Sequence, residues 1–360
     1  MIINQAPESQ AIVSNVQSTG NFALKASSKA FQILSSSLYA NKIKAIIREL
    51  SCNAVDSHVA AGKQDVPFTV HLPNSIESWF SIRDYGTGLS KEQVLNLYVT
   101  YFDSTKSESN DFIGAMGLGS KSPFSYTDNY SVTAIKDGVK GLYTAYIDDA
   151  GMPAIALMTE CETDEPSGVE VKFSVNNSND FYRFEREAIS VYTYFDLKPE
   201  IIGRNVVISN REYSHENIIP GVHLTGNYSR AVMGNIAYPI DIPNSSEVLS
   251  QELQHILSCG VEMHFPIGAL DFQASREGLS YIPLTVNAIR DKLQEVSDAL
   301  KVIIKEEVEK CNSLWAKKCK LTELRSKNLF SEVAMRYHAD NNLDWFSSKW
   351  DESDVAVTCS

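Results

Sequence analysis

The chain has 360 residues, a length typical of two domains with separate hydrophobic cores. Hydrophobic residues make up 43% and charged residues 21%, as in an ordinary globular protein. The formal net charge of -13 argues against duplex DNA as the main partner, because DNA-binding domains usually present a basic face.

The N-terminus lacks the basic-then-apolar pattern of a signal peptide, and no apolar run approaches the length of a membrane span. The six cysteines include no Cys-x-x-Cys pair, so we expect free thiols in a reducing compartment. These features predict a cytoplasmic protein without an integral membrane segment.

The first half of the chain reads as a polar start, a helix and a meander of strands. Residues 1–25 are polar and form a candidate N-terminal strap, and from Ala26 apolar residues at spacings of three and four predict a helix ending at Gly62. Alternating patterns then predict strands, with turns at 137–138 and 149–151. The expected strands are 68–72, 79–83, 130–134, 140–147, 154–158 and 168–175. A helix packed on such a meander predicts an α+β fold.

The second half is expected to begin after a polar boundary at 176–180, with a second α+β domain over 181–283. A long helix follows over 284–326, because Ile289, Leu293, Val296, Leu300 and Ile303 recur by four and three. This stripe lasts only about two heptads before Glu307, so it indicates a core-facing helix rather than a coiled coil. A polar tail occupies 340–360.

A first motif lies on the predicted N-terminal helix. Glu49, Asn53 and Asp56 are at i, i+4 and i+7 and therefore share one face. The Asn53 amide oxygen suits a magnesium ion, and Glu49 can act as a general base toward water. The alternative is a solvated helix face that carries polar side chains.

A second motif follows a predicted strand. Asp84 is followed by Gly86 and Gly88; the carboxylate can accept a hydrogen bond from the exocyclic amino group of adenine, and the glycines allow the backbone to approach the base. The alternative is an ordinary loop with a capping aspartate.

A third motif is glycine-rich and comprises Gly114, Gly117, Gly119, Ser120 and Lys121. It matches neither the P-loop nor the dinucleotide fingerprint, but amides at the start of a helix can bind phosphate, and Ser120 and Lys121 add a hydroxyl and a positive charge. A plain glycine-rich loop is the alternative. The ordered set of three motifs predicts a site for ATP with Mg²⁺.

This order of motifs resembles the GHKL superfamily, which includes gyrase B subunits, large heat-shock chaperones, histidine kinases and MutL proteins. The resemblance implies a Bergerat helix-on-mixed-sheet sandwich, followed by a smaller α+β transducer domain with a long C-terminal helix. It makes Glu49 the general base, Asn53 the magnesium ligand and Asp84 the adenine reader, and it makes the glycine segment part of a lid over the phosphates.

A narrower similarity, to the phage rIIA family, covers about 26–290. It is carried by residues 35–43, 101–114 and 117–126. The chain resembles a short member of that family, which implies a role in the host cytoplasm against host or prophage exclusion, exerted through an unknown phage or host protein partner.

Residues 271–277 are similar to the Ser-Arg-Glu loop of the heat-shock chaperones. The resemblance implies that Arg276 reaches the terminal phosphate from a neighbouring domain, and Lys106 is a candidate phosphate ligand on the same grounds. The alternative is a surface Arg276–Glu277 pair. Val169 stands where many superfamily members have a threonine beside the phosphates, which favours slow turnover.

We therefore expect a slow Mg²⁺-dependent ATPase whose lid closes over ATP and which forms an ATP-dependent homodimer through its N-terminal strap. One alternative is a nucleotide-gated binding module with little turnover, which Val169 favours. The other is a protein kinase of the same superfamily, against which Glu49 argues because it favours water as the nucleophile.

Overall fold

The computed structural model describes residues 27–98, 100, 119–209, 215–226 and 228–340. The chain forms two compact units. The first contains the residues up to 211 together with 231–238 and 265–285. The second contains residues 212–230, 239–264 and those from 286 onward. The predicted strap over 1–25 and all but the first residue of the tail lie outside the described residues. Helices and mixed sheets confirm the predicted α+β class.

The first unit contains a sheet of seven strands in the order β5-β4-β3-β6-β2-β1-β7. Neighbouring strands are antiparallel except for β1 and β7, which run parallel, so the sheet is mixed. Every strand predicted for this half of the chain is present, although β5 runs four residues further than expected, to Glu162. The bounds are β1 Thr69–His71, β2 Trp79–Arg83, β3 Asn129–Lys136, β4 Val139–Ile147, β5 Pro153–Glu162, β6 Gly168–Ser174 and β7 Glu200–Ile202.

The predicted helix from Ala26 to Gly62 is interrupted. It comprises α1 (Ser28–Gln32), the π-helical turn η1 (Ile33–Ser37) and α2 (Lys42–Ala60). The break occurs because Asn41 is extended and its side chain accepts a hydrogen bond from the Lys44 amide at 3.1 Å, which starts a new helix. Gly62, with φ of 67°, ends α2 as predicted.

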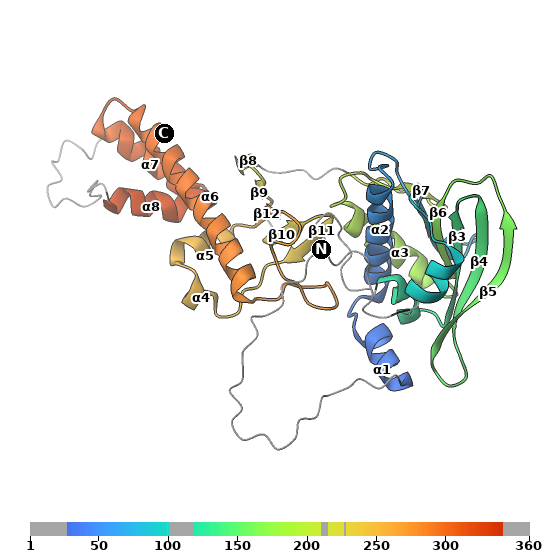
Figure 1. The fold of residues 1–360 in the computed structure, drawn as a ribbon. Helices are drawn as coiled ribbons and strands as arrows, with labels where there is room; N and C mark the ends of the chain where they lie inside the picture. The colour runs from blue at the N-terminus through green and yellow to red at the C-terminus, as the bar shows by residue number, and fades with distance from the viewer. Residues whose placement is uncertain (1–26, 99, 101–118, 210–214, 227, 341–360) are drawn as a thin grey trace, which may run out of the picture. The chain divides into compact units, whose positions relative to one another are not determined.

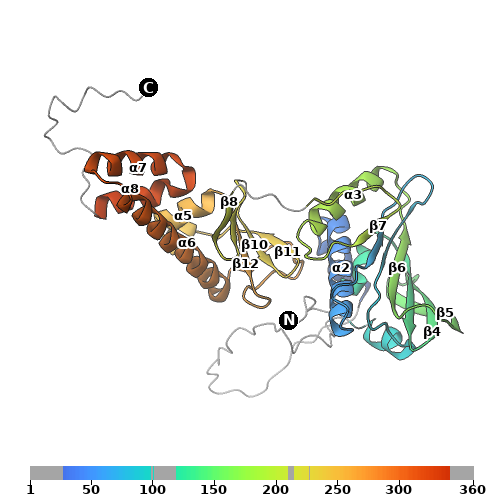
Figure 2. The ribbon, with the colours of Figure 1, turned by 90° about the horizontal axis from the view of Figure 1, so that it is seen from above.

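Helices α2 and α3 (Asn179–Tyr192) lie side by side against one face of this sheet (Figures 1 and 2). The Phe184 ring of α3 packs 4.9 Å from Phe80 of β2 and 6.1 Å from Phe173 of β6, measured between ring centroids. The segment 176–180, expected to separate two domains, runs into α3, and the first unit continues beyond α3 to include β7.

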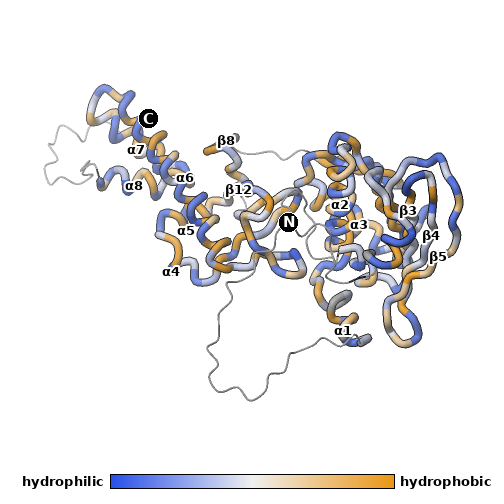
Figure 3. The backbone as a smooth tube through the Cα atoms, in the orientation of Figure 1, coloured by the Kyte–Doolittle hydropathy of each residue, from blue (hydrophilic) through white to orange (hydrophobic). Residues whose placement is uncertain are grey.

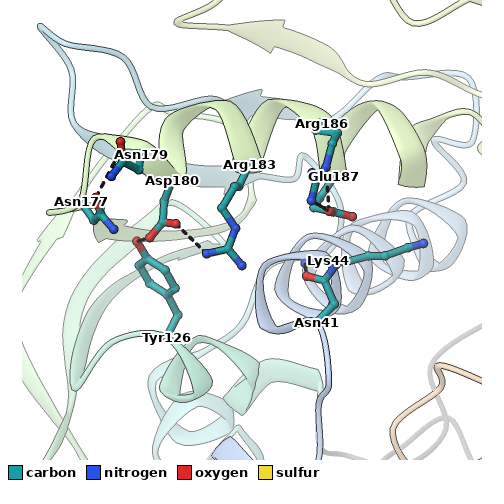
Figure 4. Close-up of polar contacts among 9 residues, drawn as sticks. All are labelled: Asn41, Lys44, Tyr126, Asn177, Asn179, Asp180, Arg183, Arg186 and Glu187. Carbon is teal, nitrogen blue, oxygen red and sulfur yellow. Dashed lines mark hydrogen bonds and ion pairs between the residues drawn. The ribbon is translucent and has the colours of Figure 1, made fainter.

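A polar cluster holds the start of α3 (Figure 4). The Asp180 carboxylate accepts hydrogen bonds from the Tyr126 hydroxyl and from Arg183, each at 2.8 Å. Tyr126 directly follows the 3₁₀ helix η3 (Gly119–Ser125). Burial, and then its hydrogen bond to Asp180, raise the pKa of Tyr126. The C-terminal end of η3 is thereby fixed to α3.

Five strands form a second sheet in the order β11-β10-β12-β9-β8. Its strands are β8 His215–Ile219, β9 Val222–Leu224, β10 Arg230–Met233, β11 Ile236–Pro239 and β12 Val261–Phe265. The helices of the second half are α4 Ser245–Val248, α5 Gln251–Ser258, α6 Pro283–Glu309, α7 Leu314–Ser326 and α8 Ser331–Asp340, with a 3₁₀ turn, η4, at Asn328–Phe330.

The long helix predicted over 284–326 is two helices, α6 and α7. Ser313 is extended and its hydroxyl accepts a hydrogen bond from the Ala316 amide at 3.1 Å, so it begins α7 after α6 has ended at Glu309. The predicted stripe at Ile289, Leu293, Val296 and Leu300 is buried, but it continues through Ile304 and Val308 rather than Ile303. Figure 3 shows the alternation of hydrophobic and hydrophilic residues along α6. Within the described ranges, no helix has both the length and the apolarity needed to cross a membrane.

Candidate functional site

The carboxylate of Glu49 is the centre of the candidate site. Its side chain is 8% exposed, and Ile46, Ile47 and Leu50 of the same helix are buried as well. Oε1 accepts a hydrogen bond from Arg48 Nε at 3.1 Å, and Oε2 accepts one from Arg276 Nη1 at 3.3 Å. Each oxygen of this buried carboxylate therefore faces a guanidinium.

The alternative of a solvated helix face is wrong. Asp56 is fully buried and Glu49 nearly so, and only Asn53 of the three predicted residues is partly exposed. Asn53 is therefore the member of this motif whose side chain a ligand reaches most directly.

Arg276 lies on a hairpin over 271–280, which is closed by a bridge between Phe272 and Leu279. The segment 265–285 belongs to the same compact unit as α2, whereas the resemblance implied a neighbouring domain. The side chain is buried over the Phe272 ring, 5.2 Å from the centroid, and it pairs with Glu49. The alternative of a surface Arg276–Glu277 pair is therefore wrong. Burial alone would lower the pKa of Arg276, but the negative Glu49 raises it above its ordinary value.

Gly119, the last glycine of the third motif, packs directly against the first motif. A Cβ built on Gly119 would lie 2.9 Å from Glu49 Oε2 and 3.5 Å from Asn53 Nδ2. With any other residue at this position, the Glu49 carboxylate or the start of η3 would have to shift. This contact brings Gly119 next to two residues of the first motif that are distant from it in the sequence.

Ser120 and Lys121 both form hydrogen bonds with other residues of the chain. The Ser120 carbonyl accepts hydrogen bonds from the hydroxyls of Tyr98 and Tyr130, each at 3.1 Å. The Lys121 ammonium is buried and donates to the Thr100 carbonyl at 2.7 Å. The ammonium carries three donors, so it can bind a phosphate oxygen in addition to this carbonyl. Lys106, Gly114 and Gly117 lie outside the described residues.

The second motif sits against the other end of α2. Asp84 Oδ1 accepts hydrogen bonds from the Ser57 hydroxyl at 3.0 Å and from the Gly86 amide at 2.9 Å. Oδ2 accepts one from the Val169 amide at 3.1 Å. Burial raises the pKa of Asp84, although the bonds from Gly86 and Ser57 oppose the rise. A carboxylate oxygen has two acceptor sites, so Oδ2 can accept a further donor.

The glycines around Asp84 are required by close backbone contacts. A Cβ on Gly86 would lie 2.1 Å from Ser57 Oγ, and one on Gly88, at φ of 65°, would lie 1.9 Å from the Ile135 carbonyl oxygen. Gly168, at φ of 145°, meets the Asp84 carbonyl oxygen in the same way. Val169, which follows Gly168, serves Asp84 through its backbone amide.

Several residues that the sequence did not single out fix this arrangement. Ser57 is one turn beyond Asn53, so its spacing was a usable signal. Arg48 was also detectable, because it pairs a charge with Glu49 inside an apolar run. The roles of His58, whose Nε2 accepts from the Tyr85 amide at 2.7 Å, and of Lys63, whose ammonium donates to the Tyr85 carbonyl at 2.7 Å, follow only from the folded loop.

The donor set suits a magnesium ion that is held mainly by a nucleotide. No group of three or more His, Cys, Asp or Glu side chains suited to a metal occurs in the part of the chain that the structure describes. Magnesium usually takes one or two protein ligands and completes its shell with waters and phosphate oxygens. The Asn53 amide, next to the space that a Gly119 Cβ would fill, fits that pattern.

No protein-family model matches the chain, and the curated proteins include no significant match to it.

Proposed function

We propose that the chain is an Mg²⁺-dependent ATP-binding protein and a slow ATPase of phage rIIA type. One observation carries the proposal: segments far apart in the sequence converge on α2, with Gly119 and Arg276 against Glu49, and Asp84 against Ser57. Each segment was predicted to serve a different part of one nucleotide, so their convergence supports a single ligand.

The residues have distinct roles in this proposal. Asp84 Oδ2 accepts a hydrogen bond from the adenine amino group, and Asn53 holds the magnesium ion through its amide oxygen. Glu49 takes a proton from water while the water oxygen bonds to the terminal phosphorus and the bond to the bridging oxygen breaks, releasing ADP. Arg276 offers a guanidinium to the terminal phosphate.

A nucleotide-gated binding module with little turnover is the second candidate. Both Glu49 oxygens already accept hydrogen bonds from arginines, so an attacking water has to compete for them, and Val169 supplies no hydroxyl. In either case ATP can drive lid closure or homodimer formation only through different affinities for the two states. The downstream partner, a phage or host protein, belongs to the rIIA resemblance alone.

Calorimetric titration with Mg²⁺–ATP tests the proposal, with Mg²⁺–GTP and an EDTA-treated sample as controls. We expect ATP to bind, GTP to bind much more weakly because its amino group lies elsewhere on the base, and EDTA to weaken ATP binding. Equal binding of GTP would contradict the role of Asp84. No heat with either nucleotide would contradict the proposal itself.

A further inference from the structure

The hairpin over 271–280 is attached to α2 by consecutive residues. The Ser275 carbonyl accepts a hydrogen bond from Arg48 Nη2 at 2.7 Å, and Arg276 pairs with Glu49. The Glu277 carboxylate accepts hydrogen bonds from the backbone amides of Ala40 at 3.0 Å and Asn41 at 2.9 Å. Asn41 is the N-cap of α2, so Glu277 places a negative charge at the positive end of that helix.

The contacts on either side of Arg276 do not use its side chain. They involve the Ser275 carbonyl and the Glu277 carboxylate, and inside the hairpin the Gln273 amide donates to the Gly278 carbonyl at 3.0 Å. The hairpin is therefore attached to α2 by two contacts that do not depend on which group the Arg276 guanidinium pairs with. The backbone of Arg276 has φ of 55°, a conformation that a residue other than glycine keeps only where its surroundings fix it.

The Glu49–Arg276 pair is buried at both ends, with side chains 8% and 6% exposed. Removing one charge from a buried pair leaves the other unpaired, which is costly. Arg276 therefore leaves Glu49 only when another anion takes its place.

We propose that the hairpin 271–280 forms an inhibitory contact that an anion releases. In this contact Arg276 pairs with the Glu49 carboxylate until a terminal phosphate draws the guanidinium away. Glu49 Oε2 then becomes free to accept a proton only when that phosphate is in place, while Oε1 keeps its hydrogen bond from Arg48. This inference rests on the proposed function and adds its regulation. Through this contact, Glu49 can act as the general base only when a triphosphate is bound.

The contact has a measurable consequence for nucleotide preference. ADP has no terminal phosphate to receive Arg276, so it leaves the Glu49–Arg276 pair intact. ATP gains the charge-assisted hydrogen bond from Arg276, and a bond of that kind changes affinity by about 10- to 100-fold.

The test compares the dissociation constants of Mg²⁺–ATP and Mg²⁺–ADP for the full chain and for Arg276→Met. We expect the wild type to prefer ATP by about 10- to 100-fold and Arg276→Met to lose that preference through weaker ATP binding, with ADP binding changed little. Arg290→Met is the matched control. The Arg290 side chain is 42% exposed and lies 3.6 Å from the Asp291 carboxylate, so this variant should keep the ATP preference.

Further outcomes separate this inference from the proposed function. An ATP preference that survives in Arg276→Met overturns the inhibitory contact alone. If the wild type binds neither nucleotide, the proposed function fails and the contact fails with it. If Arg276→Met does not fold, the double variant Glu49→Gln/Arg276→Met removes both charges of the pair and supports the same comparison. Retained ATP preference in the double variant likewise overturns the inference.

Discussion

Arg276 Nη1 lies 3.3 Å from Glu49 Oε2, although 227 positions separate the two residues in the sequence. Both side chains are buried, and segment 265–285 belongs to the compact unit that contains α2. The candidate site is therefore completed by a late hairpin of the chain rather than by the N-terminal motifs alone.

Asp84→Asn should abolish ATP binding. The Asp84 oxygens accept hydrogen bonds from Ser57, Gly86 and Val169, so an amide group in any orientation points a donor at a donor. We expect the variant to unfold about 1–3 kcal/mol more easily, the usual cost of a buried unsatisfied group. Calorimetry and urea unfolding measure both effects, and ATP binding equal to that of the wild type would show that this loop does not read adenine.

Ser57→Ala should shift the pH dependence of ATP binding upward. Burial raises the pKa of Asp84 above 3.8, and adenine needs the ionised carboxylate, so affinity falls as the pH drops through this raised pKa. The Ser57 hydrogen bond lowers that pKa, so its removal raises the pKa further and moves the midpoint of binding to higher pH. Ser131→Ala, which removes a hydroxyl bonded to the Lys172 carbonyl, is the control and should leave the midpoint in place.

The raised pKa of Asp84 makes folding stability depend on pH in the opposite direction from ATP binding. The folded state binds the Asp84 proton more tightly than the unfolded chain does, so the contribution of Asp84 to the free energy of unfolding decreases as the pH rises from 3.8 through the folded pKa. Comparing urea unfolding of wild type and Asp84→Asn across this range measures that contribution. A contribution that increases with pH would contradict the direction of the shift.

Gly119→Ala should impair turnover more than it impairs folding. The new Cβ would lie 2.9 Å from Glu49 Oε2, so either the carboxylate or the start of η3 must move. Such overpacking costs about 1–3 kcal/mol of stability. Gly226→Ala is the control, because it adds a Cβ at φ of 68° with nothing within 4 Å. Phosphate release by Gly119→Ala at the wild-type rate would mean that this contact is not part of the site.

Cys52 should resist alkylation in the native protein. It is fully buried on α2, and burial raises its pKa to about 12, so almost no thiolate is present at pH 8. Cys161 and Cys319 are exposed and should react with iodoacetamide first. Peptide mass spectrometry distinguishes the sites, and equal labelling of Cys52 would contradict the packing of α2 around Glu49.

The sequence predicted the local elements of the first unit well, because alternation and glycine turns are local signals. The positive φ of Asp137 and Gly138, for example, matches the expected tight turn. The breaks at Asn41 and Ser313 were missed because each depends on one side chain capping the next helix, which apolar periodicity does not detect.

The candidate site was predictable as a set of residues and not as a set of contacts. Spacing on one helix placed Glu49 near Asn53, but nothing local indicated that Arg48 and Arg276 would occupy both Glu49 oxygens. Nor did the sequence indicate that the Lys121 ammonium would bond to the Thr100 carbonyl. Such contacts form only when distant segments pack together.

Phosphate release from Mg²⁺–ATP by wild type and Glu49→Gln, measured side by side at matched purity, tests the central claim most directly. Glutamine keeps the size of the side chain and one acceptor for Arg48 or Arg276 but removes the general base. We predict slow release by the wild type and a loss of about 10²- to 10⁴-fold in the variant, with ATP binding retained. Equal rates in the two proteins, or no release by either, would contradict an ATPase that uses Glu49 as its base.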